Sequence, residues 1–230
     1  SLIMTELDLK EIGVQGVNSV LHSLPESTNE QSWQVHNPMG LHAIACGLDA
    51  PLKVNINGHT GFYCGGMNQQ ANITINGHAG VGVGENMMSG RICVTGNASE
   101  SAGATAHGGL LVIKGDASSR CGISMKGVDI VVGGSVGHMS AFMAQSGHLV
   151  VCGDAGDALG DSIYEAVIFV RGNVAGLGAD CVAKTMRPDH LTTLAELLAA
   201  AGIDADPSEF QRYGSARKLY NFDINNVDDY

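Results

Sequence analysis

The chain has 230 residues, of which 44% are hydrophobic and 15% are charged, and its formal net charge is −11. This length predicts one domain, or one domain with small caps. The acidic balance argues against binding to nucleic acids or anionic membranes, which attract basic surfaces. No apolar run reaches the roughly 18 residues that span a bilayer. Ser1–Met4 lacks the features of a signal peptide, so we expect a cytoplasmic protein.

Residues 1–51 are expected to form an N-terminal cap and a leading coil. Glu6–Lys10 mixes apolar and charged residues and predicts an entering strand, whereas Val14–Leu24 has the apolar spacing of one helix face. Trp33 is expected to pack over the first coil, since large aromatic rings mainly contribute packing area. Val35–Ala50 is expected to be an irregular leading coil. Because the end of a repeat array exposes unpaired strand edges, we expect the N-terminal helix to cover it.

A glycine recurs at one fixed interval through residues 52–184, the predicted core of the fold. Two aliphatic residues stand four and two positions before each glycine. The glycines are Gly58, Gly77, Gly96, Gly115, Gly134, Gly153 and Gly172. The pairs are Val54/Ile56, Ile73/Ile75, Ile92/Val94, Leu111/Ile113, Ile130/Val132, Leu149/Val151 and Ile168/Val170. A fixed period of about 20 residues indicates a solenoid, and the alternation indicates a strand with one buried face.

The other columns of the repeat predict two corners per coil. Each glycine is expected to need a positive φ or a close neighbour, and the polar residue after it suits a turn that faces water. The second residue after the glycine is small and is expected to point inward. A second tight corner is expected seven positions after the first glycine, at Gly65, Gly84, Gly103, Gly122, Ala141, Gly160 and Ala179. A mostly apolar column ten positions after the glycine is expected to point inward: Asn68, Met87, Ala106, Met125, Ala144, Ile163 and Val182.

These patterns predict an all-β fold, a right-handed single-stranded parallel β-helix of about seven 19-residue coils, capped by short helices. The hand follows from the strong preference of parallel crossovers. A leucine-rich repeat would need a leucine and asparagine spacing that is missing. The stretch from 52 to 184 makes up more than half of the chain but holds fewer than half of its Asp, Glu, Lys and Arg residues. This low charge fits either a surface of small polar residues in water or a surface covered by other subunits.

Residues 185–230 are expected to form a helical cap and a tail. Asp189 or Thr192 is a candidate N-cap for a helix that runs to about Ala201 with a stripe of leucines on one face. Gly202 is expected to end this helix, and the leucines are expected to pack against the solenoid as a cap.

The last part of the chain carries weaker signals. A second short helix is expected from Asp206 to about Tyr213, followed by a strand at Lys218–Phe222 and an acidic tail at Asn225–Tyr230. The six cysteines are scattered and form no C-x-x-C pair. They are expected to be free buried thiols, as in a reducing compartment.

Two motifs resemble a known family. Gly80–Gly84 reads G-x-G-x-G, and Phe210–Gly214 reads F-Q-R-Y-G. Together with the glycine register, they resemble the GXGXG-motif family over roughly residues 40–220. Its best-known member is the C-terminal β-helix domain of the glutamate synthase large subunit. Chains of this length look most similar to the separate GXGXG subunit of N-methylglutamate synthase and other glutamate synthase-like enzymes.

The residues themselves predict no catalytic, cofactor-binding or metal-binding site. The G-x-G-x-G run is not followed by the helix that a dinucleotide fingerprint requires. His59 and His78 share a column, but catalytic metal sites usually need three protein ligands. The acidic group Asp154, Asp157 and Asp161 lacks the calcium-repeat pattern and is expected to be a solvated corner. No G-x-S-x-G motif and no cysteine with a phase-matched histidine is present.

The resemblance therefore implies a non-catalytic structural subunit of a glutamate synthase-like complex. N-methylglutamate synthase converts methylamine and glutamate to N-methylglutamate and ammonia. The implied partners are a class II glutamine amidotransferase-like subunit and an FMN-binding subunit, so FMN, or FMN with iron–sulfur clusters, would lie in a partner chain. Two alternatives stay open. One is a free-standing, self-associating β-helix protein, and the other is a subunit like the C subunit of formylmethanofuran dehydrogenase.

Overall fold

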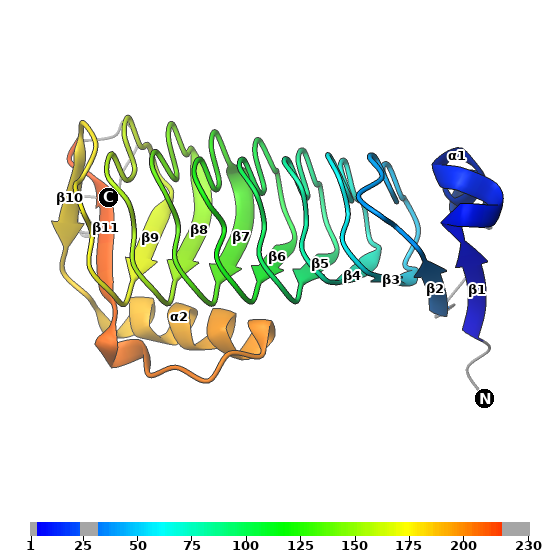
Figure 1. Cartoon of the computed structure of the whole chain (residues 1–230). Coiled ribbons are helices and arrows are strands. Elements are labelled where there is room, and N and C mark those ends of the chain that lie inside the picture. Colours follow the sequence, from blue (N-terminus) through cyan, green and yellow to red (C-terminus); the bar gives the residue numbers. More distant parts are fainter. Residues whose placement is uncertain (1–3, 24–31, 218–230) are drawn as a thin grey trace.

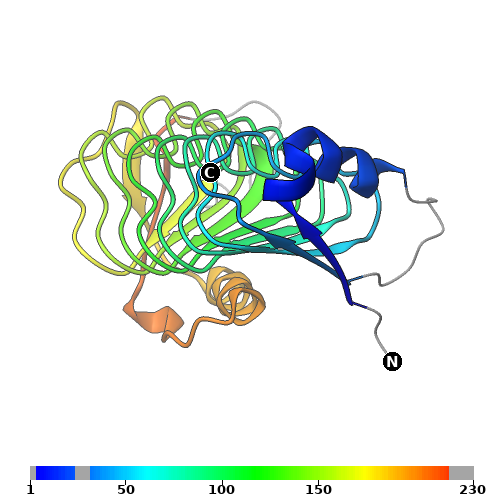
Figure 2. The same cartoon turned by 45° about the vertical axis from the view of Figure 1, so that its right-hand side comes forward.

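The chain forms an eleven-stranded sheet that winds into a parallel β-solenoid of about seven turns (Figures 1 and 2). The computed structural model describes residues 4–23 and 32–217. The elements are β1 (Met4–Asp8), α1 (Leu9–His22), β2 (Ser32–His36), β3 (Lys53–Asn57), β4 (Asn72–Asn76), β5 (Arg91–Val94), β6 (Leu110–Ile113), β7 (Lys126–Val132), β8 (Ser146–Val151), β9 (Val167–Val170), β10 (Cys181–Lys184), α2 (Pro188–Ala201), the 3-10 turn η1 (Pro207–Glu209) and β11 (Gln211–Ser215). The all-β, parallel, one-strand-per-coil prediction is confirmed.

The strands stack in the register that the repeat predicts. Ile73 of β4 lies beside Ile92 of β5, which lies beside Leu111 of β6. The aliphatic pair of every coil is buried, with at most 1% of each residue exposed. The column ten positions after the glycine is buried as well, except that Val182 is 39% exposed. The prediction is wrong for Val182 because it lies in β10, where the chain leaves the coil.

Close packing, and not backbone conformation, explains most of the first glycine column. Gly58 has a φ of 134°, but the six later glycines of the column do not have a positive φ. A Cβ at any of these six would lie only 2.1 to 2.6 Å from an atom of the preceding coil. Such contacts are essentially never tolerated, so glycine is required there by its neighbours.

The atoms that crowd these glycines belong largely to a ladder of hydrogen bonds, which we call the corner ladder. The side chain after each glycine accepts the backbone N–H of its counterpart in the next coil, at 2.8–2.9 Å. The acceptors are His59, His78, Asn97, Asp116, Ser135 and Asp154. The column that was predicted to face water therefore also ties successive coils together.

The predicted second corner is present, and six of its seven members have a left-handed backbone. Gly65, Gly84, Gly103, Gly122, Ala141 and Gly160 have φ values between 57° and 71°. This region costs a residue with a Cβ roughly 1–2 kcal/mol, which explains why glycine dominates the column. Ala179, in the last coil, does not have a positive φ.

Helix α1 covers the first arc of the solenoid, as predicted. Gly13 interrupts it with a φ of 67° and a ψ of 178°, so a short helical turn from Leu9 precedes the main helix, which starts at Val14 as predicted. Asp8 caps this first turn by accepting the N–H of Lys10 at 2.8 Å. The Asn18 side chain donates to the carbonyl of Ala43 at 2.9 Å and accepts the N–H of Ala45 at 2.8 Å. One amide side chain thus replaces the backbone partners that a preceding coil would supply.

The leading coil forms one turn of the solenoid, and its predicted irregularity is limited to the length of that turn. β2 joins the parallel ladder in full register, with Trp33 beside Val54 and Val35 beside Ile56. Paired residues of β2 and β3 are two positions further apart in the sequence than paired residues of β3 and β4. The leading coil therefore does not follow the period of the other coils. Trp33 is 6% exposed and belongs to the main core, where it packs against the first coil of the repeat as expected.

Helix α2 lies along the outer face of the sheet and not across the end of the solenoid (Figures 1 and 2). Its Leu194 and Leu198 belong to a second apolar cluster with outward-facing residues of the sheet. The strand members of this cluster are Cys93, Val112, Val131, Val150 and Phe169, and Cys152 directly follows β8. In the described part of the chain, no helix is both long and apolar enough to cross a membrane.

The start of α2 differs from the prediction, whereas its end is as predicted and is held by contacts from the solenoid. The helix begins at Pro188 after Arg187, so the predicted caps Asp189 and Thr192 are wrong. It ends, as predicted, at Gly202, which has a left-handed φ of 67°. Arg91 and Lys114 of the solenoid donate to its last carbonyls, where the helix dipole favours cations.

The end of the described chain differs from the prediction. The helix expected to reach Tyr213 is only the short turn η1, and β11 follows it. β11 inserts between β9 and β10 and runs antiparallel to both. Arg212 of this strand is 1% exposed, and its guanidinium donates to the carbonyl of Thr185. The strand predicted at Lys218–Phe222 and the tail at Asn225–Tyr230 lie outside the described residues.

Gly115 and Gly176 allow a test of the corner ladder. A Cβ at Gly115 would lie 2.1 Å from Asn97 Oδ1, whereas one at Gly176 would lie 3.7 Å from its nearest neighbour. We expect Gly115→Ala to lower the free energy of unfolding by about 1–3 kcal/mol, as overpacking does, and Gly176→Ala to change it far less. Urea unfolding of both variants measures the difference. Equal losses would contradict the steric account.

The buried cysteines predict an alkaline loss of stability. All six cysteines are free, as predicted, and burial raises the pKa of both Cys64 and Cys121 to about 12. Below pH 9 these thiols are protonated in folded and unfolded chains alike. Between about pH 9 and 12 only the unfolded thiols ionise, so the free energy of unfolding should fall by about 1.4 kcal/mol per pH unit for each thiol.

A double variant isolates this effect from the titration of other groups. Ala102 occupies the same column as Cys64 and Cys121, so Cys64→Ala with Cys121→Ala fits the coil. Its unfolding free energy, followed by urea titration from pH 8 to 11, should have a shallower slope than that of the parent chain by about 2.7 kcal/mol per pH unit. Parallel curves would rule out the thiols as the source.

Candidate functional site

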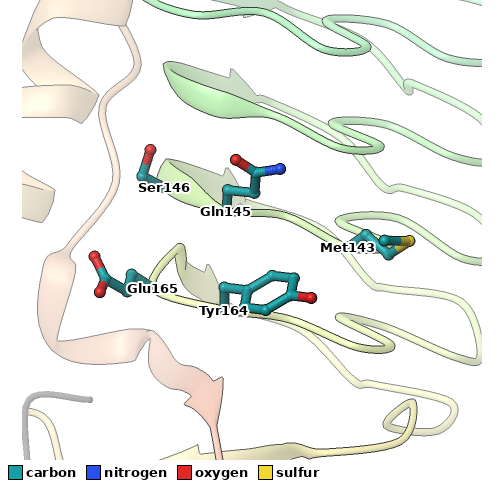
Figure 3. A pocket seen from close by; sticks show the side chains of 5 residues that line it. All are labelled: Met143, Gln145, Ser146, Tyr164 and Glu165. Atoms are coloured by element: carbon teal, nitrogen blue, oxygen red, sulfur yellow. The ribbon is translucent and has the colours of Figure 1, made fainter. Parts of the chain in front are cut away.

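A surface cleft of about 490 Å³ lies on two successive coils near the C-terminal end of the solenoid (Figure 3). It is lined by Met143, Gln145, Ser146, Tyr164 and Glu165. The backbone N–H of Glu165 donates to the carbonyl of Gln145 at 2.8 Å, so the two coils hold these residues in a fixed relation. Figure 3 shows Gln145 above Tyr164 and Ser146 above Glu165.

The cleft offers hydrogen bonds and one carboxylate. One contact to the Tyr164 ring comes from Arg217, whose guanidinium lies 5.2 Å from the ring centre and pairs with Asp180 at 2.8 Å. In the described part of the chain, no hydrogen bond joins the Ser146 hydroxyl to Glu165 or to a histidine. An activated serine nucleophile has such a base within hydrogen-bond reach, and Ser146 has none among the described residues.

The paired histidines of the sequence are brought together, but in structural roles. The rings of His59 and His78 stack with their centres 4.8 Å apart. His59 Nδ1 accepts the N–H of His78, and His78 Nδ1 accepts the N–H of Asn97. A neutral ring that accepts at Nδ1 carries its proton on Nε2, and that nitrogen is then not a metal ligand. His42 accepts the N–H of Phe62 in the same way.

The acidic group also separates into individual contacts. Asp154 belongs to the corner ladder, and Asp161 accepts from Ser162 and Ala179. Asp157 lies 2.8 Å from His138, and this hydrogen bond lowers the pKa of its carboxyl. Within the described ranges, no three His, Cys, Asp or Glu side chains are grouped as a metal site would need.

In the G-x-G-x-G run, Gly80 and Gly82 are required by a neighbouring coil, and Gly84 is required by its backbone conformation. A Cβ on Gly80 would lie 2.6 Å from the backbone of Gly61, and one on Gly82 would lie 2.8 Å from the Tyr63 ring. Gly84 has a left-handed φ of 67° at the second corner. The next element in the chain is the strand β5 and not a helix, so the helix dipole of a phosphate site is missing.

Cys46, the one cysteine that is not fully buried, lacks the features of a nucleophile. Its Sγ donates to the carbonyl of Tyr63, and burial raises the pKa of its thiol. Reactive cysteines instead have a lowered pKa beside a cation or a helix N-terminus.

Five large apolar residues are exposed on the arcs of the first coils, and we call this set the arc patch. It contains Met39, Leu41, Phe62, Tyr63 and Met67, each at least 40% exposed. His42 stacks on Phe62 at 4.4 Å, and Phe62 meets Tyr63 edge-on at 6.4 Å, so the aromatic rings are fixed in place. Aromatic residues and methionine are enriched in protein interfaces. The sequence predicted uncharged outward positions, but not this cluster.

These features define a parallel β-solenoid protein that presents a fixed apolar surface. No known protein-family model matches the chain. Protein GlxC of Rhizobium meliloti (strain 1021) is 60% identical over 228 residues, which cover 99% of this chain and 100% of that protein. The chain belongs to the family of Protein GlxC.

His78 allows a second test of the corner ladder. His78→Ala removes the acceptor for the Asn97 N–H and should lower the free energy of unfolding by about 0.5–1.5 kcal/mol. His78→Asn restores an acceptor, since Asn97 plays this role one coil later, and should lose less than half as much. Amide hydrogen exchange at Asn97 should be faster in the alanine variant alone. Equal exchange in both variants would contradict this role.

Proposed function

We propose that the chain is a non-catalytic structural subunit of a glutamate synthase-like enzyme complex. The observation that carries this proposal is the arc patch, in which Phe62 and Tyr63 are 47% and 49% exposed on a rigid solenoid. Large exposed apolar groups on a folded protein mark interaction sites. The glycine register, the G-x-G-x-G run and the F-Q-R-Y-G segment support the enzyme class by resemblance. The 60% identity to Protein GlxC, over 99% of this chain and 100% of that protein, shows that the two chains belong to one family.

The specific complex that we propose is N-methylglutamate synthase. It would form N-methylglutamate and ammonia from methylamine and glutamate. A class II amidotransferase-like subunit and an FMN-binding subunit would be the partners, and the flavin would be held by the latter. The six free cysteines agree with a cytoplasmic location. In this proposal the solenoid holds its partners at a fixed separation and supplies no catalytic residue.

Co-purification tests the proposal in three distinguishable ways. The chain, recovered under native conditions from its source cell, should bring an amidotransferase-like and a flavin-containing subunit in fixed ratio. The isolated chain should bind no FMN. A molybdopterin protein in their place would favour the formylmethanofuran dehydrogenase type of complex, and a homo-oligomer without partners would favour a self-associating solenoid.

The arc patch can be removed without disturbing the fold. Ser119 and Ser101 occupy the same columns in later coils as Phe62 and Tyr63, and Ser101 has nearly the same φ as Tyr63. We expect the double variant Phe62→Ser and Tyr63→Ser to lower partner affinity at least tenfold, as loss of aromatic hot spots does. Its thermal midpoint should stay close to that of the parent chain.

A second variant serves as the matched control. Tyr164 is an exposed aromatic residue several coils away, and Gln145 precedes it in its column. Tyr164→Gln should leave unchanged the affinity for the partner that docks on the arc patch, because the cleft around Tyr164 is a separate surface. Equal loss in both variants would show that the docking surface is not confined to the first coils.

A further inference from the structure

One carboxylate lies beside the arc patch and restricts what can dock there. Glu85 belongs to the second coil of the repeat, and its backbone carbonyl accepts the N–H of Met67 at 2.8 Å. A Cβ at Gly82 would lie 2.8 Å from the Tyr63 ring and 3.2 Å from Glu85 Oε2. The carboxylate and the ring therefore lie against the same glycine.

No cation on the arcs of the first coils neutralises this carboxylate. The arcs of the leading coil and of the next three coils are residues 37–51, 58–71, 77–90 and 96–109. Among Asp, Glu, Lys and Arg, these arcs contain only Asp49, Glu85 and Glu100. Glu100 lies 4.0 Å from Arg120 of the following arc. Within the residues that the structure describes, the side chain of Glu85 has neither an ion pair nor a hydrogen bond.

A partner that covers the arc patch would remove more water from Glu85. This residue is already half-buried, and burial raises the pKa of its carboxyl. An ionised carboxylate that loses water without gaining a cation is strongly disfavoured. The exposed apolar residues of the arc patch thus favour an apolar partner, whereas Glu85 disfavours a partner that is apolar throughout.

An arginine side chain satisfies both requirements. Its guanidinium is planar, pairs with a carboxylate through two parallel hydrogen bonds and stacks on aromatic faces, whereas a lysine ammonium is a strongly hydrated point charge. The chain already contains this combination at another place. Arg217 lies 5.2 Å from the centre of the Tyr164 ring and pairs with Asp180 at 2.8 Å. Tyr63 and Glu85 present the ring and the carboxylate of such a group without its cation.

We infer that the arc patch docks a partner segment of apolar side chains and one arginine, which pairs with Glu85 and lies over the ring of Tyr63. This inference rests on the proposed function, in which the arc patch is a docking surface, and it adds the chemistry of the segment that docks. Arginine is enriched in protein interfaces together with aromatic residues and methionine, which is the composition of this pairing.

The test measures binding of the subunit that co-purifies with the full-length chain and loses affinity for the Phe62→Ser and Tyr63→Ser variant. We expect Glu85→Gln to weaken binding of this subunit at least tenfold, because the partner's arginine loses its carboxylate inside the interface. High salt should reduce the difference between Glu85→Gln and the parent chain. Glu165→Gln, the same change in the cleft around Tyr164, should leave this affinity unchanged. The thermal midpoint of each variant verifies that it is folded.

The partner supplies a second readout. Hydrogen exchange identifies the partner segment that the parent chain protects and the Phe62→Ser and Tyr63→Ser variant does not. This segment should contain an arginine. Its change to glutamine should weaken binding to the parent chain at least tenfold but should hardly weaken binding to Glu85→Gln, since two groups that act on each other are not additive.

The outcomes separate this inference from the proposed function. If no subunit co-purifies, or if none responds to the change of Phe62 and Tyr63, the arc patch is not a docking surface and both are overturned. If a subunit responds to that change but binds Glu85→Gln as tightly as the parent chain, or more tightly, only the inference is overturned. A protected segment without arginine overturns the inference in the same way and leaves the docking surface in place.

Discussion

Each coil is fixed to the next by a side chain that accepts the backbone N–H of its counterpart in the following coil. This contact requires a side chain whose acceptor atom lies close to its own backbone. It also requires a glycine just before the residue that donates the N–H, because the acceptor atom occupies the space that a Cβ of that glycine position would fill. His59, Asn97, Asp116 and Ser135 all meet the first requirement, so the acceptor varies along the chain while the glycine does not. A coil with one residue more or fewer would lose both the contact and its steric match, which explains the absence of insertions between Gly58 and Gly172.

The interior of the solenoid could be predicted from the sequence because it depends on one local pattern. In each strand, inward aliphatic residues alternate with outward residues, and this pattern recurs at a fixed interval. The position of α2 depends on the outer face of the sheet, where a second column of residues also follows the repeat. The outward residue of each strand is polar in the first two coils, at Asn55 and Thr74, and becomes apolar from Cys93 onward. An outward apolar column needs a cover, and α2 with Leu194 and Leu198 is that cover. The leucines of α2 show only that one face of this helix is buried. By themselves they therefore predicted a cap on the solenoid and did not indicate which surface the helix covers.

β11 and the candidate sites were less accessible from sequence. Pro207 favours a local helical turn, and nothing near it indicates that the strand after this turn pairs with β9 and β10, which precede α2 in the chain. The histidine pair was found, but its chemistry depends on which ring nitrogen meets a backbone N–H, and only the stacked geometry decides that. The arc patch was missed because its residues lie in an arc where Tyr63 and Met67 have a positive φ. There the alternation rule for inward and outward side chains does not hold.

The distribution of covered and open surface bears on the proposed role. α1 covers the first arc, and α2 covers the outer face of the later strands (Figure 1). The arc side keeps the arc patch on the first coils and the cleft around Tyr164 on the later ones.

Five coils separate Phe62 from Tyr164, which at the usual strand spacing is about 25 Å. Because every coil between them is tied to its neighbours by the corner ladder and the parallel sheet, this separation cannot change without breaking many hydrogen bonds at once. Two partners bound at such positions would be held in a constant relation, and rigidity of this kind is a contribution that a structural subunit can make to catalysis without a catalytic residue.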